Sequence, residues 1–440
     1  MSHKTLFTAL LILSLIAKGY TQSLDRGKLD QLLNLLSEKD KAMGTLLINK
    51  EGNALYSRSI GYGYINGTGK KPLTMSARYR IGSVTKMFTA TMVYQLVEEG
   101  KLNLTDHLDK FYPQIPNASE ITIEQILAHR SGIPGAGMEQ HFASKRFTGV
   151  TKDEILEAIA QGRPEFGPGE KYSYSNAGYF ILGNIIEKAG RQPYNKALQQ
   201  RISSKIGLKD TYAATADIDV NKNECFSFKY YTDWKQEPVT HHSFLFGSGF
   251  IISTVADQAK FIEALFGGKL ISQQSLDQMI RLQSGMDSFT YNGKTFYGHT
   301  GGVDGFGSWL AYQPEEKLTL AYATNGKVYP VGKIIDHIFD IYYNKPLDIP
   351  SFESLEISTE TLDKYVGVYA IAEAPVKFTV KRDGNKLLIE MSGRPAFAVE
   401  PITEDKFKTD SPPMEFHFDV IKKQMTIKRG GGEKVFTKEN

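Results

Sequence analysis

Cysteine is almost absent from this chain of 440 residues, in which Cys225 is the single thiol. One thiol excludes a disulfide within the chain and any metal site made from several cysteines. No motif surrounds Cys225, and a free cysteine usually packs as a small apolar side chain. We therefore expect Cys225 to lie in the core.

A strong excess of either charge is also lacking. The formal net charge is +3, and Lys4 and Lys18 belong to a leader that we expect to be removed. Proteins that bind nucleic acid or a membrane surface usually carry a clear charge bias. We therefore expect neither kind of partner, and a small molecule or a peptide is the expected substrate. The oligomeric state has no signature in the sequence.

A long hydrophobic run is missing as well. The apolar run at residues 6–17 is shorter than the about 20 residues that cross a bilayer. His3 and Lys4 precede it, and small or polar residues follow at 19–22. This order is typical of a secretory signal. We predict a signal peptide over residues 1–22, cleavage near residues 19–22, and a periplasmic or secreted protein without stable membrane insertion. A membrane anchor is the alternative.

The order of the expected elements predicts an α+β fold. Strand-like segments at residues 43–48 and 54–64 flank a turn, and three more lie at residues 297–300, 307–312 and 318–324. Helical patterns occupy the chain around and between them, at residues 24–39, 84–99, 123–129, 151–160, 176–189, 254–266 and 334–342. The pattern at 84–99 predicts a helix with one buried stripe, and Thr151 and Glu154 predict a capping box. Strands at both ends indicate one antiparallel sheet with a helical insertion.

The last part of the chain has a different pattern. Residues 346–360 contain Pro346 and Pro350 and are predicted to be a linker, which ends the larger domain of residues 23–345. Within residues 361–440, short alternating segments lie at residues 365–370, 376–381, 386–391, 416–420 and 425–428. They predict a small all-β domain, either a partial barrel or a sandwich.

The first candidate site lies where a predicted helix begins. Ser83 is at its start and Lys86 is one turn further on, so the two side chains share one face, about 5–6 Å apart at Cβ. The first helical turn disfavours a cation, and shielding from water also lowers the pKa of a lysine. A lysine near neutrality can take a serine proton. The plainer alternative is a serine cap and a surface lysine.

A second candidate stretch is Tyr174-Ser175-Asn176, which follows a loop rich in glycine and proline. A phenol has a pKa of about 10, but beside a cation it ionises more easily and can relay protons. Asn176 can accept from a lysine and donate to a substrate carbonyl. The alternative is a turn in which Ser175 or Asn176 only caps the next helix.

The third stretch is His299-Thr300-Gly301-Gly302, in a predicted strand. Glycine in a strand allows another backbone to approach closely. This suits a substrate that lies along a sheet edge and bonds through its main chain. A strand end followed by a loose glycine turn is the alternative.

Together, Ser-x-x-Lys at residue 83, Tyr-x-Asn at 174 and His-Thr-Gly at 299 resemble the motifs of the serine β-lactamase and penicillin-binding-protein superfamily. The nearest likeness is to class C β-lactamases, D-alanyl-D-alanine carboxypeptidases and related esterases, over about residues 25–345. The C-terminal part resembles, more weakly, the lipocalin-like β domain appended to such hydrolases.

The resemblance implies that Ser83 is the acylated nucleophile and that Lys86 and Tyr174 share the proton transfers. The backbone N–H groups of Ser83 and Gly302 would form the oxyanion hole. Substrate binding would fall to the remaining motif residues, Asn176, His299, Thr300 and Gly301. No metal or organic cofactor is implied.

One departure from the family pattern is His299, where the β-lactamases and most penicillin-binding proteins have lysine. A histidine in contact with an anion is expected to titrate at or above about pH 6.5. The predicted function is an exported serine hydrolase that forms an acyl-enzyme on D-amino-acid peptides or small esters. A class C-like β-lactamase, which His299 disfavours, and a non-catalytic penicillin-binding sensor are the alternatives.

Overall fold

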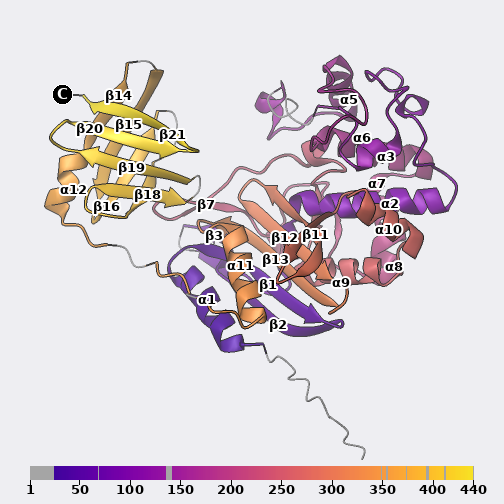
Figure 1. Ribbon diagram of the computed structural model, residues 1–440, viewed down its shortest axis with the longest axis horizontal. Coiled ribbons are helices and arrows are strands. Elements are labelled where there is room, and N and C mark those ends of the chain that lie inside the picture. The colour runs from indigo at the N-terminus through magenta and orange to yellow at the C-terminus, as the bar shows by residue number, and fades with distance from the viewer. Residues whose placement is uncertain are drawn as a thin grey trace, which may run out of the picture.

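The computed structural model describes residues 24–439, except residues 68, 135–140, 348, 353–354, 373, 393–395 and 411–412. The predicted signal segment therefore lies outside the described residues. Figure 1 shows a larger region, with a sheet flanked by helices, and a smaller β barrel that follows it in the chain.

The larger region is built on an antiparallel sheet. Its main strands are β1 (Ala42–Lys50), β2 (Asn53–Ile60), β10 (Asp287–Tyr291), β11 (Lys294–Val303), β12 (Phe306–Gln313) and β13 (Leu318–Lys327). Their order is β10-β11-β12-β13-β1-β2. β1 pairs with β13, with Thr45 opposite Ala323, so the sheet joins the two ends of the region as the sequence predicted. A short hairpin, β7 (Phe228–Tyr230) and β8 (Trp234–Gln236), meets β13.

Alternate residues of each strand face two different cores, because side chains along a strand point to opposite faces. On β1, Leu46 and Ile48 join the core formed with α1 (Arg26–Glu38) and α11 (Val331–Tyr342). Leu47 joins the core on the other face, where α9 (Val255–Phe266) packs. The sheet is thus covered by helices on both faces (Figure 1).

The expected helices form near their expected bounds. Besides α1, α9 and α11, the described helices of this region are α2 (Thr85–Glu98), α3 (Ile123–Leu127), α5 (Lys152–Gln161), α6 (Asn176–Gly190), α7 (Tyr194–Leu198), α8 (Ser204–Ile206) and α10 (Gln273–Arg281). Thr151 caps α5 in the predicted capping box with Glu154. We did not predict α7, α8 or α10, and α7 and α8 are short pieces joined by a π-helical turn.

α2 differs from the prediction of a helix with one buried stripe. All residues from Thr85 to Leu96 are buried, because α2 packs against α6, α7 and β11. Its buried threonines are hydrogen-bonded: Thr89 donates to the Gly247 carbonyl at 2.7 Å and Thr91 to the Met87 carbonyl at 2.8 Å. Hydrogen-bonded threonines can be buried at little cost.

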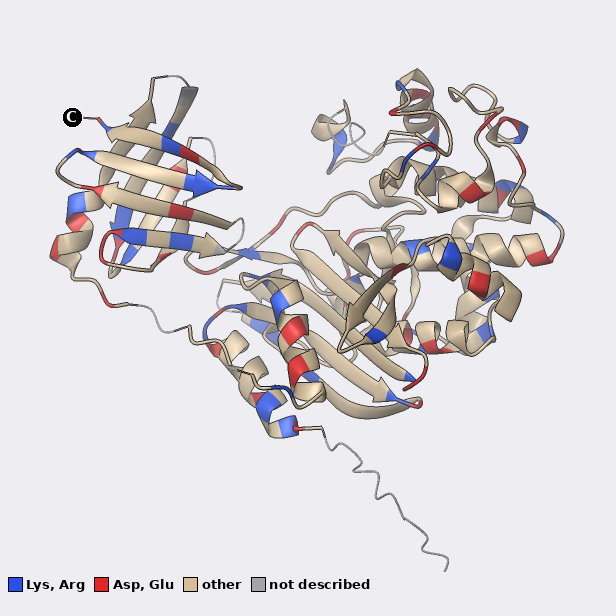
Figure 2. Cartoon of the chain, in the orientation of Figure 1, with Lys and Arg blue, Asp and Glu red and all other residues tan. Residues whose placement is uncertain are grey.

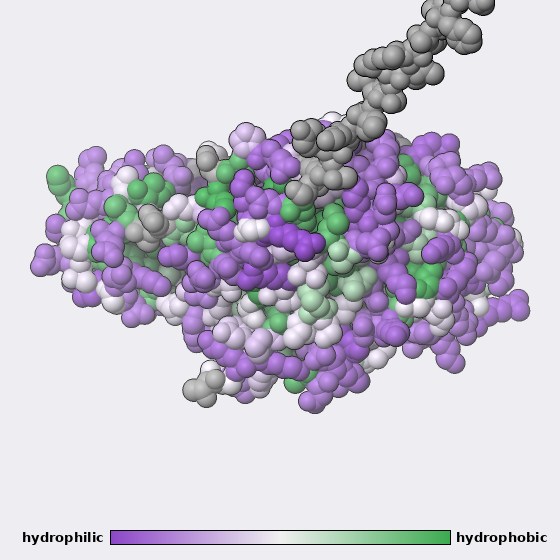
Figure 3. Space-filling model, turned by 90° about the horizontal axis from the view of Figure 1, so that it is seen from below, coloured by the Kyte–Doolittle hydropathy of each residue, from purple (hydrophilic) through white to green (hydrophobic). Residues whose placement is uncertain are grey.

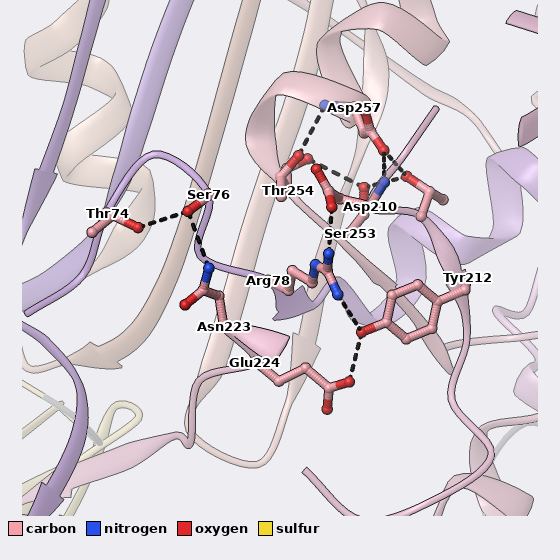
Figure 4. A network of polar contacts seen from close by, with 11 residues as sticks. Thr74, Ser76, Arg78, Asp210, Tyr212, Asn223, Glu224, Ser253, Thr254 and Asp257 are labelled. Atoms are coloured by element: carbon pink, nitrogen blue, oxygen red, sulfur yellow. Dashed lines mark hydrogen bonds and ion pairs between the residues drawn. The ribbon is translucent and has the colours of Figure 1, made fainter. Parts of the chain in front are cut away.

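A polar network fixes the segment that leads into the first candidate site (Figure 4). Arg78 donates to Asp210 and to the hydroxyl of Tyr212, and this hydroxyl donates to Glu224 at 2.6 Å. Asp257, on α9, accepts from the backbone N–H of Asp210 at 2.7 Å. The chain before Ser83 is therefore tied to α9 by charged hydrogen bonds.

Two small sheets complete the larger region. β5 (Tyr79–Arg80) and β6 (Tyr212–Ala213) both pair with β9 (Ile251–Ser253). β3 (Tyr62–Asn66) pairs with β4 (Gly69–Pro72), so the strand predicted for residues 54–64 is divided between β2 and β3. Cys225 is 3% exposed, and its thiol donates to the Arg78 carbonyl at 3.2 Å. The predicted core position of Cys225 is confirmed.

The C-terminal part forms a closed barrel of eight strands. They are β14 (Gly367–Ile371), β15 (Ala374–Asp383), β16 (Lys386–Met391), β17 (Phe397–Pro401), β18 (Lys406–Asp410), β19 (Pro413–Asp419), β20 (Gln424–Arg429) and β21 (Gly432–Lys438). β14 pairs with β21 and closes the barrel. We did not predict β17, β18 or β21; on β21 only Phe436 is buried, which leaves little apolar alternation to detect.

One end of the barrel is covered by α12 (Thr359–Tyr365), whose Leu362 and Tyr365 join the barrel core. A cavity of about 1260 Å³ lies between the barrel and the larger region. Apolar side chains from both sides line it, among them Phe228, Tyr230, Phe407 and Phe436. An ion pair between Lys41 and Glu400 also joins the two regions.

Charged side chains of both signs are interspersed over the helices and the barrel strands (Figure 2). On the face shown in Figure 3, hydrophobic residues form separate patches among hydrophilic ones. Among the described residues, no helix combines the length and the apolar character needed to cross a bilayer.

Candidate active site

Ser83 lies in a tight turn between β5 and α2. The turn is the 3-10 helix Gly82–Val84, with a φ of 53° at Gly82. A Cβ at Gly82 would lie 2.6 Å from the backbone N of Gly302, a distance that no side chain tolerates. Glycine at position 82 is therefore required for the close approach of β11, which brings the third sequence motif beside Ser83.

Lys86 is fully buried, and its ammonium group has three polar neighbours. Its Nζ lies 3.2 Å from Ser83 Oγ, 2.8 Å from Asn176 Oδ1 and 2.9 Å from the Ser248 carbonyl. Burial lowers the pKa of Lys86 from 10.5 to about 7, because a charged amine is poorly solvated inside the protein. This is the direction that the sequence predicted, and it leaves much of the lysine neutral at physiological pH.

Tyr174 lies on the other side of the serine. It hydrogen bonds with Ser83, and the centre of its ring is 4.7 Å from Lys86 Nζ. We expected a neighbouring cation to ease its ionisation, but burial outweighs this and raises the pKa of Tyr174 above its usual value of 10. Tyr174 is therefore a phenol at neutral pH, and Lys86 is the better base of the two.

His129 supports the loop that carries Tyr174. The N–H of Ser175 donates to His129 Nδ1 at 3.0 Å, and the His129 ring lies 4.5 Å from the Tyr174 ring. Burial lowers the pKa of His129 to about 3, so the ring stays neutral and can accept. The side chain of Ser175 caps α6 by accepting from the N–H of Gly178 at 3.0 Å, which fixes Asn176 at the helix start.

The third motif occupies the end of β11, against the turn that holds Ser83. A Cβ at Gly301 would lie 2.0 Å from the Ile81 carbonyl, and the Ser308 hydroxyl donates to the same carbonyl at 2.7 Å. Gly301 is thus needed for packing. Gly302 and Thr300 are exposed at the strand edge, where a substrate can reach their backbone groups.

His299 is nearly buried, at 6% exposure, and its Nδ1 hydrogen bonds with the Thr300 carbonyl. The pKa at or above about 6.5 that we expected belongs to His299 in contact with an anionic substrate, and it stays a prediction. Burial and the nearby Lys86 lower the pKa of His299, against the opposing effect of Asp287. His299 is accordingly neutral at physiological pH in the free protein.

Asp287 is a residue of the site that sequence reasoning missed. It lies on β10 opposite Gly298, and its Oδ2 is 3.9 Å from His299 Nε2. Only the strand register brings it there, because Asp287 and His299 are not adjacent in any local motif. Within the described residues, no cluster of three or more histidine, cysteine, aspartate or glutamate side chains could hold a metal ion.

The structure therefore brings the three motifs into one site. A serine beside a buried, near-neutral lysine and a phenol is the arrangement of a serine hydrolase that forms an acyl-enzyme. The family model described as Beta-lactamase matches residues 30–342. The chain belongs to this family, and it is a serine hydrolase of the β-lactamase and penicillin-binding-protein superfamily.

Several known proteins are similar to it. Penicillin-binding protein 4* of Bacillus subtilis (strain 168) is 26% identical over 430 residues, which cover 89% of this chain and 93% of that protein. An octameric penicillin-binding protein homologue from Pyrococcus abyssi has a TM-score of 0.65 and 25% identity, and the match covers 94% of this chain and 100% of that chain. This match extends through the barrel.

The D-amino acid amidase from Ochrobactrum anthropi SV3, solved with L-phenylalanine amide, shares the fold of the larger region. Its TM-score is 0.62 at 22% identity, and the match covers 72% of this chain and 98% of that chain.

Proposed function

We propose that the enzyme hydrolyses amide or ester bonds of small D-amino-acid derivatives through an acyl-enzyme on Ser83. The observation that carries the proposal is the 3.2 Å approach of Lys86 Nζ to Ser83 Oγ in a fully buried environment. A lysine with a pKa of about 7 can remove the serine proton at neutral pH without a metal ion.

In the proposed reaction, neutral Lys86 takes the Ser83 proton as Oγ attacks the substrate carbonyl. The backbone N–H groups of Ser83 and Gly302 stabilise the oxyanion, where each such donor is worth about 10²–10³ in rate. Tyr174, which is protonated and bonded to Ser83, donates a proton to the leaving group and regains one from protonated Lys86. Asn176 keeps Lys86 aimed at the serine. Water then attacks the acyl group while neutral Lys86 takes its proton, and this proton returns to Ser83 as the acid is released.

The fold shared with the D-amino acid amidase supports D-amino-acid derivatives as substrates. A β-lactam is a less suitable substrate, because its carboxylate would meet a neutral His299 rather than a lysine. We also propose that residues 1–22 export the enzyme, on the pattern of a basic start and a short apolar run.

Ser83→Ala tests the proposal. Since the hydroxyl is the nucleophile, we expect loss of fluorophosphonate labelling and a fall in ester hydrolysis of about 10³–10⁶-fold, with an unchanged circular dichroism spectrum. A folded Ser83→Ala protein that labels as well as the wild type would remove Ser83 from this role.

A substrate panel narrows the activity. D-phenylalanine amide, a D-alanyl-D-alanine peptide, a p-nitrophenyl ester and nitrocefin would be compared with the wild-type enzyme. We expect steady turnover of the amide or the ester and little of nitrocefin. A single burst without turnover on all four would indicate the non-catalytic sensor instead.

A further inference from the structure

Asp287 brings a negative charge to the substrate side of the site. It begins β10, the strand at the edge of the sheet, and pairs with Gly298, the residue before His299. Its carboxylate reaches to 3.9 Å from His299 Nε2, while the side chain remains 59% exposed. An exposed carboxylate next to His299 can interact electrostatically with a substrate that lies along the end of β11.

The other ionisable groups around Asp287 do not neutralise it. Lys86 is the nearby basic group; its pKa of about 7 leaves it only partly charged at neutral pH, and its Nζ is already directed at Ser83, Asn176 and the Ser248 carbonyl. The phenols of Tyr172, Tyr174 and Tyr179 and the ring of His129 also surround the site, and each is in its uncharged form at neutral pH.

His299 itself does not supply a positive charge that balances Asp287. Its Nδ1 is occupied by the Thr300 carbonyl, so Nε2, the nitrogen that faces Asp287, is the one left for a ligand. Burial and Lys86 lower the pKa of His299. A substrate anion beside His299 Nε2 would therefore face the Asp287 carboxylate, and no protonated imidazole would lie between the two negative charges.

We propose that Asp287 is a specificity-determining residue that rejects substrates whose leaving group carries a carboxylate, so that the enzyme acts on amides and esters with uncharged leaving groups. The leaving group of a peptide that loses its last residue always bears a carboxylate. The site therefore favours amidase and esterase activity over carboxypeptidase activity. The inference rests on the proposed acyl transfer to Ser83.

A pair of esters that differ mainly in charge provides the test. The probes are 3-carboxyphenyl phenylacetate and 3-carbamoylphenyl phenylacetate, and the readout is the ratio of their kcat/KM values. The wild type should prefer the carbamoyl ester. Asp287→Asn removes the charge with little change of shape, so it should shift the ratio toward the carboxy ester by about three- to tenfold, the range for one partly exposed charge. Intrinsic differences in ester reactivity cancel between the two proteins.

Asp336→Asn is the matched control. Asp336 is an exposed aspartate on α11, paired with Lys333 at 3.8 Å, and the same loss of charge there should leave the ratio at its wild-type value. His299→Lys should move the ratio in the same direction as Asp287→Asn, because it supplies the missing cation.

A second readout separates a charge effect from a structural one. Asp287 raises the pKa of Lys86, so Asp287→Asn should shift the acidic limb of the kcat/KM profile for the carbamoyl ester to lower pH. An Asp287→Asn protein whose substrate ratio and pH profile both match the wild type would overturn the inference, as would a wild type that prefers the carboxy ester. Loss of hydrolysis of both esters together with loss of fluorophosphonate labelling in the wild type would instead refute the proposed function.

Discussion

The larger region buries lysine and histidine side chains, whereas the described strands of the barrel bury neither. Lys86, His129 and His299 are each at most 6% exposed. In the described part of the barrel, the buried side chains of the strands are apolar, from Tyr369 to Phe436. Barrel charges lie in surface pairs such as Lys381–Glu390. Burying an ionisable group is costly. The buried lysine and histidines therefore indicate that the larger region performs the chemistry.

The site around Ser83 is also separate from the cavity beside the barrel. The site around Ser83 is polar and is formed by β11, α2 and α6, all within the larger region. The cavity at the barrel is lined by side chains such as Phe407 and Phe436, and neither Ser83 nor Lys86 lines it. We therefore expect the barrel to affect stability or access, and the larger region to perform acyl transfer.

Among the changes that test this comparison of the two regions, Lys86→Met is expected to have the largest effect on activity. It removes the proposed general base, so kcat/KM for a p-nitrophenyl ester should fall by about 10²–10⁴-fold. The free energy of unfolding at pH 7 should not fall, because an apolar side chain of similar length replaces a buried amine. Steady-state kinetics and urea unfolding measure the two. A large loss of stability would show that Lys86 is retained for the fold rather than for catalysis.

The pH dependence of the free energy of unfolding tests whether buried Lys86 has a lowered pKa. The pKa of Lys86 is about 7 in the folded protein and 10.5 when unperturbed. Between these values the unfolded chain binds a proton that the folded protein does not, so this group makes the free energy of unfolding rise with pH from about 7 to 10. Lys86→Met should lack that part of the slope. The free energy of unfolding would be measured by urea unfolding at several pH values. If it rose equally steeply with pH in the wild type and in Lys86→Met between about pH 7 and 10, the lowered pKa of Lys86 would be contradicted.

Removal of the barrel should have the smallest effect on chemistry. A chain that ends at Pro350 keeps every residue of the candidate site, and we expect it to unfold cooperatively and to retain fluorophosphonate labelling. Loss of labelling in a folded chain of this length would show that the barrel contributes to the site. Ile389→Ala, in the barrel core, is the matched control in the full chain. It should lower the barrel's free energy of unfolding by about 2–5 kcal/mol without changing kcat/KM.

Local patterns in the sequence were enough to predict most of the larger fold. The apolar spacing of residues 24–39 and 334–342 depends on neighbours three or four positions apart, and α1 and α11 form where it predicts. The capping box at Thr151 is equally local. By contrast, β21 shows little alternation, because a barrel strand with one buried residue carries almost no periodic signal.

The candidate site was predicted in its motifs but not in its electrostatics. Ser83, Lys86 and Asn176 come together as the spacing and the family resemblance implied. The pKa direction expected for Tyr174 was wrong, and the lowered pKa of His299 in the free protein was not predicted, because each depends on burial by segments distant in the chain. Asp287 was missed for the same reason: the register of β10 on β11, which no motif encodes, brings it to His299.

The central claim is that a buried, near-neutral Lys86 activates Ser83, and the pH dependence of acylation tests it most directly. The acylation rate constant of the wild type with 3-carbamoylphenyl phenylacetate would be measured by stopped flow from pH 5 to 10. The rate should rise with a single midpoint near pH 7, where Lys86 loses its proton. A midpoint near 10, or a rate that does not change over this range, would contradict the account.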